Sequence, residues 1–236
     1  MSIAEKSIII AENVPKVYQA GYEKGKAEGG SGENPFYYAT RLDNVFAGAV
    51  FPDGYDVIIK VKKAPENSSY TFHQAVGYKS TKFISEDNTN IISFNHSHRI
   101  TAYTPTLETV DLTQYNTKFK LLNEAFRGQK KLKSILGAMD VSNCTNVTNA
   151  FFECDALEDI EFVPNTIKIS IAFTYNGKLT NASKQSIFDG LATVETAQTL
   201  TLHANLKILQ SQVDSANAKG WTVAGGTVVS EEEYYG

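Results

Sequence analysis

Two histidines in the segment FNHSHRITAYTP have the spacing of metal ligands. His96 and His98 are separated by one residue, so on a β-strand both imidazole rings would face the same side, as ligands of one ion must. A metal site needs a third protein ligand, and none stands near the pair in the sequence. Two solvent-facing histidines therefore explain the pattern better, and we expect no bound metal and no cofactor.

Carboxylates in ECDALEDIEF could act as a general acid and base. Glu153 and Asp155 form one pair, and Glu158, Asp159 and Glu161 follow. Such groups hydrolyse glycosides when two of them face each other across a cleft. Here they stand beside alternating apolar residues, which favours a solvated strand face. The segment GGSG lacks the Lys-Ser or Lys-Thr of a phosphate loop, so the sequence predicts no catalytic residue.

Tyrosines are better candidates for a function in binding. A Tyr ring can stack on a sugar or anchor a protein partner at low entropic cost. We expect Tyr103 in TAYTP and Tyr115 in TQYN near one end of neighbouring repeats, as a possible ligand surface. The alternative interpretation is that both rings are partly buried packing residues.

A repeated pattern predicts the elements that position these residues. NEAFRGQKKLKSIL and NAFFECDALEDIEF share one plan, and extending the alignment gives aromatic separations of 26, 22, 32, 25 and 22 residues, for Phe46, Phe72, Phe94, Phe126, Phe151 and Phe173. Apolar anchors then open strands, namely Tyr78, Leu107, Leu132 and Leu157. Such periods with an LxxLxL-like strand are typical of leucine-rich repeats. The predicted fold class is therefore α/β, with a leucine-rich-repeat solenoid of short parallel strands over 36–180.

Stacking explains why the pattern recurs. One repeat has a single apolar edge, which it can bury only against its neighbours. The two cysteines, Cys144 and Cys154, lie inside the pattern, and we expect buried free thiols. Residues 36–105 are the least regular part, and FNHSHRITAYTP matches a repeat poorly.

The C-terminal part has a different pattern, which predicts an α/β cap over 181–225. The spacing of apolar residues predicts a helix over 181–194 with Ser183 as its N-cap. A strand in QTLTLH, a helix over 205–220 and a strand at WTVAGG follow, and 226–236 is a tail. Such a cap would close the end of the solenoid.

The N-terminal segment 1–30 predicts a helix for oligomerisation or docking. A heptad-like apolar seam runs through Ile3, Ile10, Val14, Val17 and Gly21. Pro15 kinks this helix or begins a second one. The glycine-rich composition before Pro35 predicts a flexible linker over 31–35.

Composition narrows the classes of partner. The net charge of −4 and pI near 5.6 provide no basic surface for phosphates, which excludes a nucleic-acid partner. No run of about 18 apolar residues predicts a membrane span, and the first residues lack the pattern of a secretion signal. From the sequence we expect no membrane insertion and no export.

Nearly the whole chain resembles the BspA-like leucine-rich-repeat proteins of phages and prophages of gut Firmicutes. The segments that carry this resemblance are AENVPKVYQAGYEKGKAEGG, FAGAVFPDGYDVIIKV, LETVDLTQYN, FVPNTIKISIAF, SIFDGLATVETAQTLTLHANLK and KGWTVA. The resemblance implies a tail or other virion protein without a catalytic motif. The AFxxC turn of that family appears as AFFEC at 150–154, but as AFRGQ at 125–129 and AFTYN at 172–176. These departures predict a less regular stack.

Three hypotheses for the function follow. The first is a non-enzymatic phage structural protein, a tail or other virion protein. It would form a homotrimer, contact other virion proteins, and bind a host cell-surface protein or glycan through its repeat surface. The second is a bacterial surface adhesin or ligand-binding module, which would require a signal peptide or wall anchor. The third is a carbohydrate-active enzyme, which would require a convergent pair of carboxylates.

Overall fold

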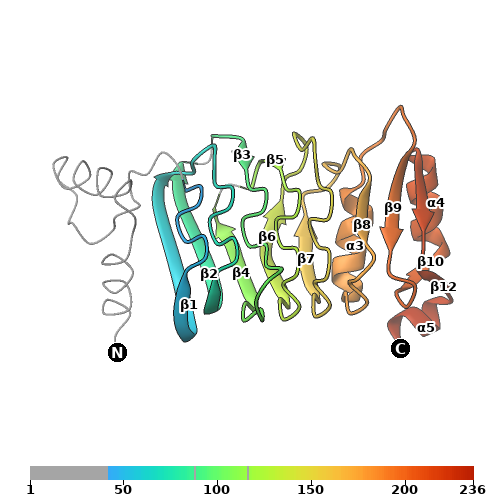
Figure 1. Ribbon diagram of the computed structural model, residues 1–236. Coiled ribbons are helices and arrows are strands. Elements are labelled where there is room, and N and C mark those ends of the chain that lie inside the picture. The colour runs from blue at the N-terminus through green and yellow to red at the C-terminus, as the bar shows by residue number, and fades with distance from the viewer. Residues whose placement is uncertain (1–41, 88, 116) are drawn as a thin grey trace.

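The computed structural model describes residues 42–236 except 88 and 116 (Figure 1). The predictions for the linker and the N-terminal seam fall outside the described residues, as do Ile3, Ile10, Val14, Val17 and Gly21. The described elements are β1 (Val50–Lys63), β2 (Val76–Asp87), β3 (Ile92–Ser93), β4 (Thr109–Gln114), β5 (Phe119–Leu121), β6 (Ser134–Met139), β7 (Asp159–Phe162), β8 (Ile171–Phe173), α3 (Asn181–Gly190), β9 (Gln198–Leu202), β10 (Lys207–Leu209), α4 (Gln210–Ala218), β11 (Trp221–Ala224), β12 (Thr227–Val229) and α5 (Glu231–Tyr235).

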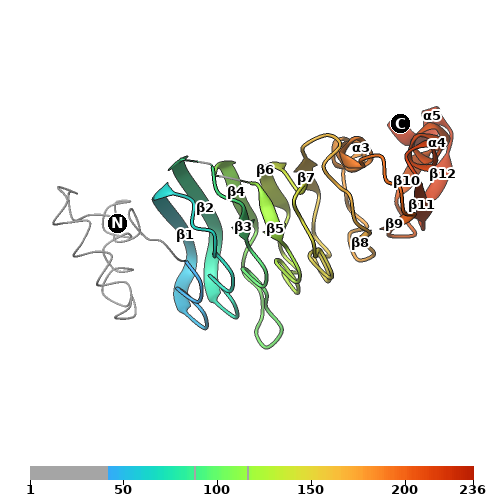
Figure 2. The ribbon, with the colours of Figure 1, turned by 90° about the horizontal axis from the view of Figure 1, so that it is seen from above.

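The strands form open sheets of parallel strands, which confirms the predicted α/β class. The largest sheet has five strands in the order β1-β2-β4-β6-β7, and a three-stranded sheet has the order β11-β9-β8. Two-stranded sheets pair β3 with β5 and β10 with β12. Seen from above, the five-stranded sheet lines one side of the molecule and connecting loops line the other (Figure 2). Among residues 42–236 as described, the helices α3, α4 and α5 all lie in the C-terminal part (Figure 1).

The predicted anchors occupy equivalent positions in this sheet. Ser80, Thr109, Ser134 and Asp159 are register partners on successive strands. The predicted anchors lie two residues before these register partners, one anchor in each strand segment. Each anchor is at most 1% exposed, and the four are Tyr78, Leu107, Leu132 and Leu157. Side chains of β7 then alternate between exposed and buried, as a strand with one solvated face requires. The core is therefore a set of rows in which equivalent residues of successive strands pack on each other.

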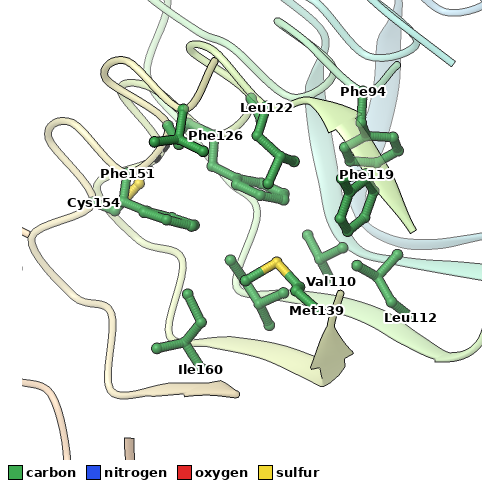
Figure 3. Packing of buried hydrophobic residues seen from close by; sticks show 14 of the residues in the cluster. Phe94, Val110, Leu112, Phe119, Leu122, Phe126, Met139, Phe151, Cys154 and Ile160 are labelled. Atoms are coloured by element: carbon green, nitrogen blue, oxygen red, sulfur yellow. Dashed lines mark hydrogen bonds between the residues drawn. The ribbon is translucent and has the colours of Figure 1, made fainter. Parts of the chain in front are cut away.

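A row of stacked rings, here called the aromatic ladder, forms a second part of the core. Its neighbouring rings are 5.0–5.9 Å apart with interplanar angles of 9–24°, and its members are Phe46, Phe72, His98, Phe126, Phe151 and Phe173. The prediction that Phe94 belongs to this row is wrong. Phe94 packs on Phe119 instead, with ring centroids 5.5 Å apart (Figure 3).

The alignment failed here because it accepted only Phe at the ladder position. With His98 in place, the separations become 26, 26, 28, 25 and 22 residues. Backbone hydrogen bonds fix this register, since the N–H of Phe72 donates to Ser97 O at 2.6 Å and that of His98 donates to Ala125 O at 2.7 Å. FNHSHRITAYTP therefore contains a regular turn of the stack, contrary to the expectation of irregularity.

His98 is paired with a second polar residue inside the core. Thr81 is the polar member of an otherwise apolar row of register partners, formed with Val57, Val110, Ile135 and Ile160. Its Oγ1 lies 3.1 Å from Nε2 of His98, and both residues are buried. Burial lowers the pKa of His98 to about 3, so the ring is neutral at physiological pH. The Thr81 hydroxyl and Nε2 of His98 are thus paired between apolar neighbours, whereas Nδ1 of His98 is buried without a hydrogen-bond partner.

Side chains three residues after the ladder ring join successive turns. Gln129 Nε2 donates to His98 O at 2.6 Å, and Asn176 Nδ2 donates to Phe151 O at 3.3 Å and to Cys154 O at 2.9 Å. The thiol of Cys154 donates to Phe126 O at 3.1 Å. AFFEC, AFRGQ and AFTYN therefore place interchangeable donors at one position, so these departures preserve the stacking that they were expected to disturb.

Both cysteines are buried free thiols, as predicted. Burial raises the pKa of Cys144 and of Cys154. Neither thiol is poised to ionise, which fits a role in packing.

The C-terminal part confirms most of the predicted elements and corrects their ends. Helix α3 stops at Gly190, four residues earlier than predicted, and its N-cap is Thr180, whose Oγ1 accepts from Ser183 N at 3.2 Å. Helix α4 begins at Gln210 because the preceding residues form β10. The assigned tail packs with the cap, since β12 pairs with β10 and Tyr234 is only 6% exposed.

Candidate functional site

Five turns of the chain place equivalent residues beside one another along the ladder. In each turn, the residue two positions before the ring has a left-handed backbone, with φ between 52° and 59°: Asn44, Tyr70, His96, Glu124 and Asn149. The residue directly after the ring gives a second row, formed by Ala47, His73, Arg99, Arg127 and Phe152. The polar and aromatic side chains of these two rows contact one another, and Tyr175, two positions after the ladder ring Phe173, extends the contacts. We call this set of side chains the turn strip. Its members are Tyr70, His73, His96, Arg99, Glu124, Arg127, Phe152 and Tyr175.

Three rings form one end of the turn strip. The rings of Tyr70 and His96 stack with centroids 4.7 Å apart and planes inclined by 11°. His73 meets Tyr70 edge to face at 5.4 Å, and Asn123 Nδ2 lies 3.2 Å from Nε2 of His96. All three rings are half-buried, so they are held in place while one side remains accessible.

An ion-pair network forms the centre of the turn strip. Glu124 receives Arg99 Nε on Oε2 at 2.7 Å and Arg127 Nη1 on Oε1 at 2.9 Å. Nδ1 of His96 lies 3.4 Å from Oε2, and Arg99 Nη1 lies 3.4 Å from Nε2 of His73. One carboxylate thus fixes two guanidinium groups from neighbouring turns.

Two aromatic rings continue the turn strip on the far side of the network. The Arg127 guanidinium lies 5.1 Å from the ring centroid of Phe152, within the range of a cation–π contact. Phe152 in turn packs on Tyr175, with centroids 4.4 Å apart. Tyr175 is 41% exposed. The contacts therefore run without interruption from Tyr70 to Tyr175.

The charge of the turn strip is determined by its arginines and its glutamate. Burial is the largest cause that lowers the pKa of His73, and the charges of Arg99 and His96 lower it further. Burial also lowers the pKa of His96, and the nearby Glu124 opposes the shift. Both rings are therefore mainly neutral at pH 7. Two guanidinium groups and one carboxylate leave an excess of one positive charge.

The two tyrosines predicted as a ligand surface have different positions. Tyr103 is 60% exposed, and its segment is tied to the turn of Tyr70, because Gln74 Oε1 accepts from Thr101 N at 3.0 Å. Tyr115 is 5% exposed, its pKa is raised by burial, and its Oη lies 3.2 Å from Ser68 Oγ. Tyr115 cannot present a surface, so that prediction is wrong, and the alternative of a packing residue holds.

The histidine pair is divided between the core and the surface. His96 and His98 lie in a turn rather than on a strand, so their rings do not face the same side. His98 is fully buried, whereas His96 belongs to the turn strip. Among the described residues, no group of three or more His, Cys, Asp or Glu side chains could hold a metal ion.

The carboxylates considered for catalysis are distributed over two elements. Glu153 ends a turn with a left-handed φ of 58°, and Asp155 is exposed just after it. Asp159 and Glu161 lie on the exposed side of β7, and Ser134 Oγ donates to Asp159 Oδ2 at 3.0 Å. Glu158 is half-buried directly before that strand.

Sequence reasoning missed the turn strip apart from His96. A signal was present, because the positions two before and one after the ladder rings of the three central repeats, at Phe72, His98 and Phe126, carry only aromatic, histidine or charged residues. This signal was hidden because Phe94 was aligned in the place of His98, which shifted the alignment of that repeat by four residues.

Comparisons with known proteins give no further assignment. No family model matches the sequence, and searches of curated proteins and of solved structures return no match. In the part of the chain that the structure describes, none of the helices combines the length and the apolar character needed to cross a bilayer.

Proposed function

We propose that the chain is a non-enzymatic binding protein, built as a leucine-rich-repeat solenoid of the BspA-like kind, that recognises a host cell surface through its turn strip. The observation that carries this proposal is the uninterrupted strip of half-buried rings and guanidinium groups on consecutive turns. Such groups are pre-positioned by their neighbours, and a rigid surface loses little entropy on binding. Aromatic and Arg side chains are also those that dominate binding energies at interfaces.

The regular spacing supports the solenoid. Ladder separations of 22 to 28 residues resemble the period of leucine-rich repeats. Parallel pairing of successive strands and equivalent hydrogen bonds between successive turns agree with a stack in which each repeat contacts its neighbours.

Binding to cells can be tested directly with purified protein. Fluorescently labelled full chain is incubated with gut Firmicutes cells beside a variant carrying Arg99→Gln and Arg127→Gln. A matched control, Lys120→Gln with Lys168→Gln, removes two positive charges at exposed positions outside the strip. We expect cell binding by the wild type and the control and its loss in the arginine variant. Equal binding by all three proteins, or none by the wild type, would reject the strip as a recognition surface.

We further propose that the protein is part of a phage particle and assembles as a homotrimer through the N-terminal seam. The sequence pattern of Ile3, Ile10, Val14, Val17 and Gly21 supports this. Light scattering of the full chain beside a version lacking residues 1–32 tests the assembly, with a trimer and a folded monomer as the expected masses. Antibody labelling of purified particles tests the location, and labelling of the bacterial surface alone would favour an adhesin.

A further inference from the structure

Two positions before the ring, the turn strip has other residues at the left-handed position where its flanking turns carry Asn. The left-handed position is occupied by Asn44 and Asn149 in the outer turns, and Asn adopts this conformation readily. The three turns between them have Tyr70, His96 and Glu124 at φ of 57°, 53° and 52°. Non-glycine residues held in this region are strained, and such strain concentrates at ligand-binding sites. The three side chains that replace Asn also contact one another through the strip, which indicates a shared role.

The central charges match an anionic group. Arg99 contacts Glu124 through Nε and Arg127 contacts it through Nη1, which orients both guanidinium groups and leaves their Nη2 donors for another acceptor. The excess positive charge favours a carboxylate or phosphate, which guanidinium groups bind with paired hydrogen bonds. The side chains of Arg99 and Arg127 are 26% and 30% exposed, so they are reachable from solvent.

The arrangement of rings favours an extended ligand. Rings flank the charged centre on both sides, as Tyr70 stacked on His96 and as Phe152 packed on Tyr175. Four steps between neighbouring turns separate Tyr70 from Tyr175, and at the usual spacing of paired strands this distance is about 19 Å. An array of this length suits several units of a linear polymer better than one small molecule.

We infer that the turn strip binds a linear anionic glycan polymer, with sugar faces packed on the terminal rings and the anionic groups held by Arg99 and Arg127. This inference rests on the proposed binding function and specifies its ligand. The anion can be the carboxylate of a uronic acid or the phosphodiester of a teichoic-acid-type polymer, because both accept paired guanidinium donors.

Calorimetry with three defined polymers tests the ligand class. Hyaluronan oligosaccharides supply carboxylates, polyglycerol phosphate supplies phosphodiesters, and dextran is the neutral reference. We expect at least one anionic polymer to bind and dextran not to bind. We also expect Arg99→Gln with Arg127→Gln to weaken binding by about tenfold or more, and Lys120→Gln with Lys168→Gln to leave it within about twofold. Binding of dextran as tight as that of the anionic polymers, or equal losses in both variants, would overturn the inference.

A second variant separates binding from folding. Tyr70→Asn, His96→Asn and Glu124→Asn together place the residue of the outer turns at all three strained positions. We expect this protein to remain folded, as judged by circular dichroism, and to lose polymer binding, because Tyr70 and His96 supply the rings and Glu124 orients both guanidinium groups. Retained binding would refute the assignment. If cells are bound through the arginines while neither anionic polymer binds, the ligand class is wrong and the proposed function stands.

Discussion

Replacing Thr81 by Val and His98 by Phe would convert the buried polar pair into the apolar type of its neighbours. The pair costs stability in acid, because His98 binds a proton near pH 6.5 when unfolded and only near pH 3 when folded. Acid therefore favours the unfolded chain, and the folded state loses stability as the pH falls below 6.5. The loss grows towards a limit of about 5 kcal/mol, since each unit of the pKa difference corresponds to about 1.4 kcal/mol.

The assay is urea unfolding of the wild type and the double variant at pH 7.5 and pH 5. At the higher pH both forms of His98 are neutral, whereas at pH 5 the histidine destabilises the wild type by about 2 kcal/mol. We expect the stability difference between the two proteins to shift by that amount in favour of the variant. The other histidines are present in both proteins and cancel in the difference.

A control with unchanged titration is Phe151→Leu, which alters the aromatic ladder at a ring that does not contact His98. The difference in the free energy of unfolding between this control and the wild type should be the same at pH 7.5 and at pH 5. A pH-independent difference for Thr81→Val with His98→Phe would refute the argument, because it would mean that His98 titrates normally in the folded protein.

Three further predictions concern the stack. Phe151→Ala, at 1% exposure within the ladder, should lower the free energy of unfolding by about 3–5 kcal/mol, as measured in urea. Asn176→Ala removes two hydrogen bonds to the carbonyls of Phe151 and Cys154, which keep only their backbone donors, and should cost about 1–3 kcal/mol. The exposed control Asn143→Ala should stay within about 0.5 kcal/mol. Gly77→Ala should cost more than about 1 kcal/mol by thermal unfolding, because the residue has φ +90° and a Cβ there would lie 1.8 Å from Phe51 O; a cost below that would mean that the backbone relaxes easily.

The elements that were predicted well depend on short sequence spacing. Leu107, Leu132 and Leu157 were recognised as anchors because each stands at a fixed offset from the strand that it opens. The strand at 198–203 and both longer C-terminal helices could be identified for the same reason. Their ends were less accurate, since β10 and the early stop of α3 are determined by packing and pairing with distant segments.

The candidate site was much less accessible to prediction. Tyr115 and Tyr103 look alike in the sequence, yet Tyr115 is buried with its hydroxyl beside Ser68, 47 residues away. The contacts of Glu124 with Arg99 and His96 likewise join residues from different turns. Such contacts follow from the register between turns rather than from any local pattern.

By itself, the sequence determined that apolar residues recur with the period of a stacked repeat and that the C-terminal part has a different pattern. Local spacing contains this information, because each repeat must present the same edge to its neighbour. The tertiary structure alone decided that His98 occupies the place of a phenylalanine and that charged and aromatic residues of five turns form one strip. Hydrogen bonds between turns about 25 residues apart set that register, and only the folded chain brings those turns together.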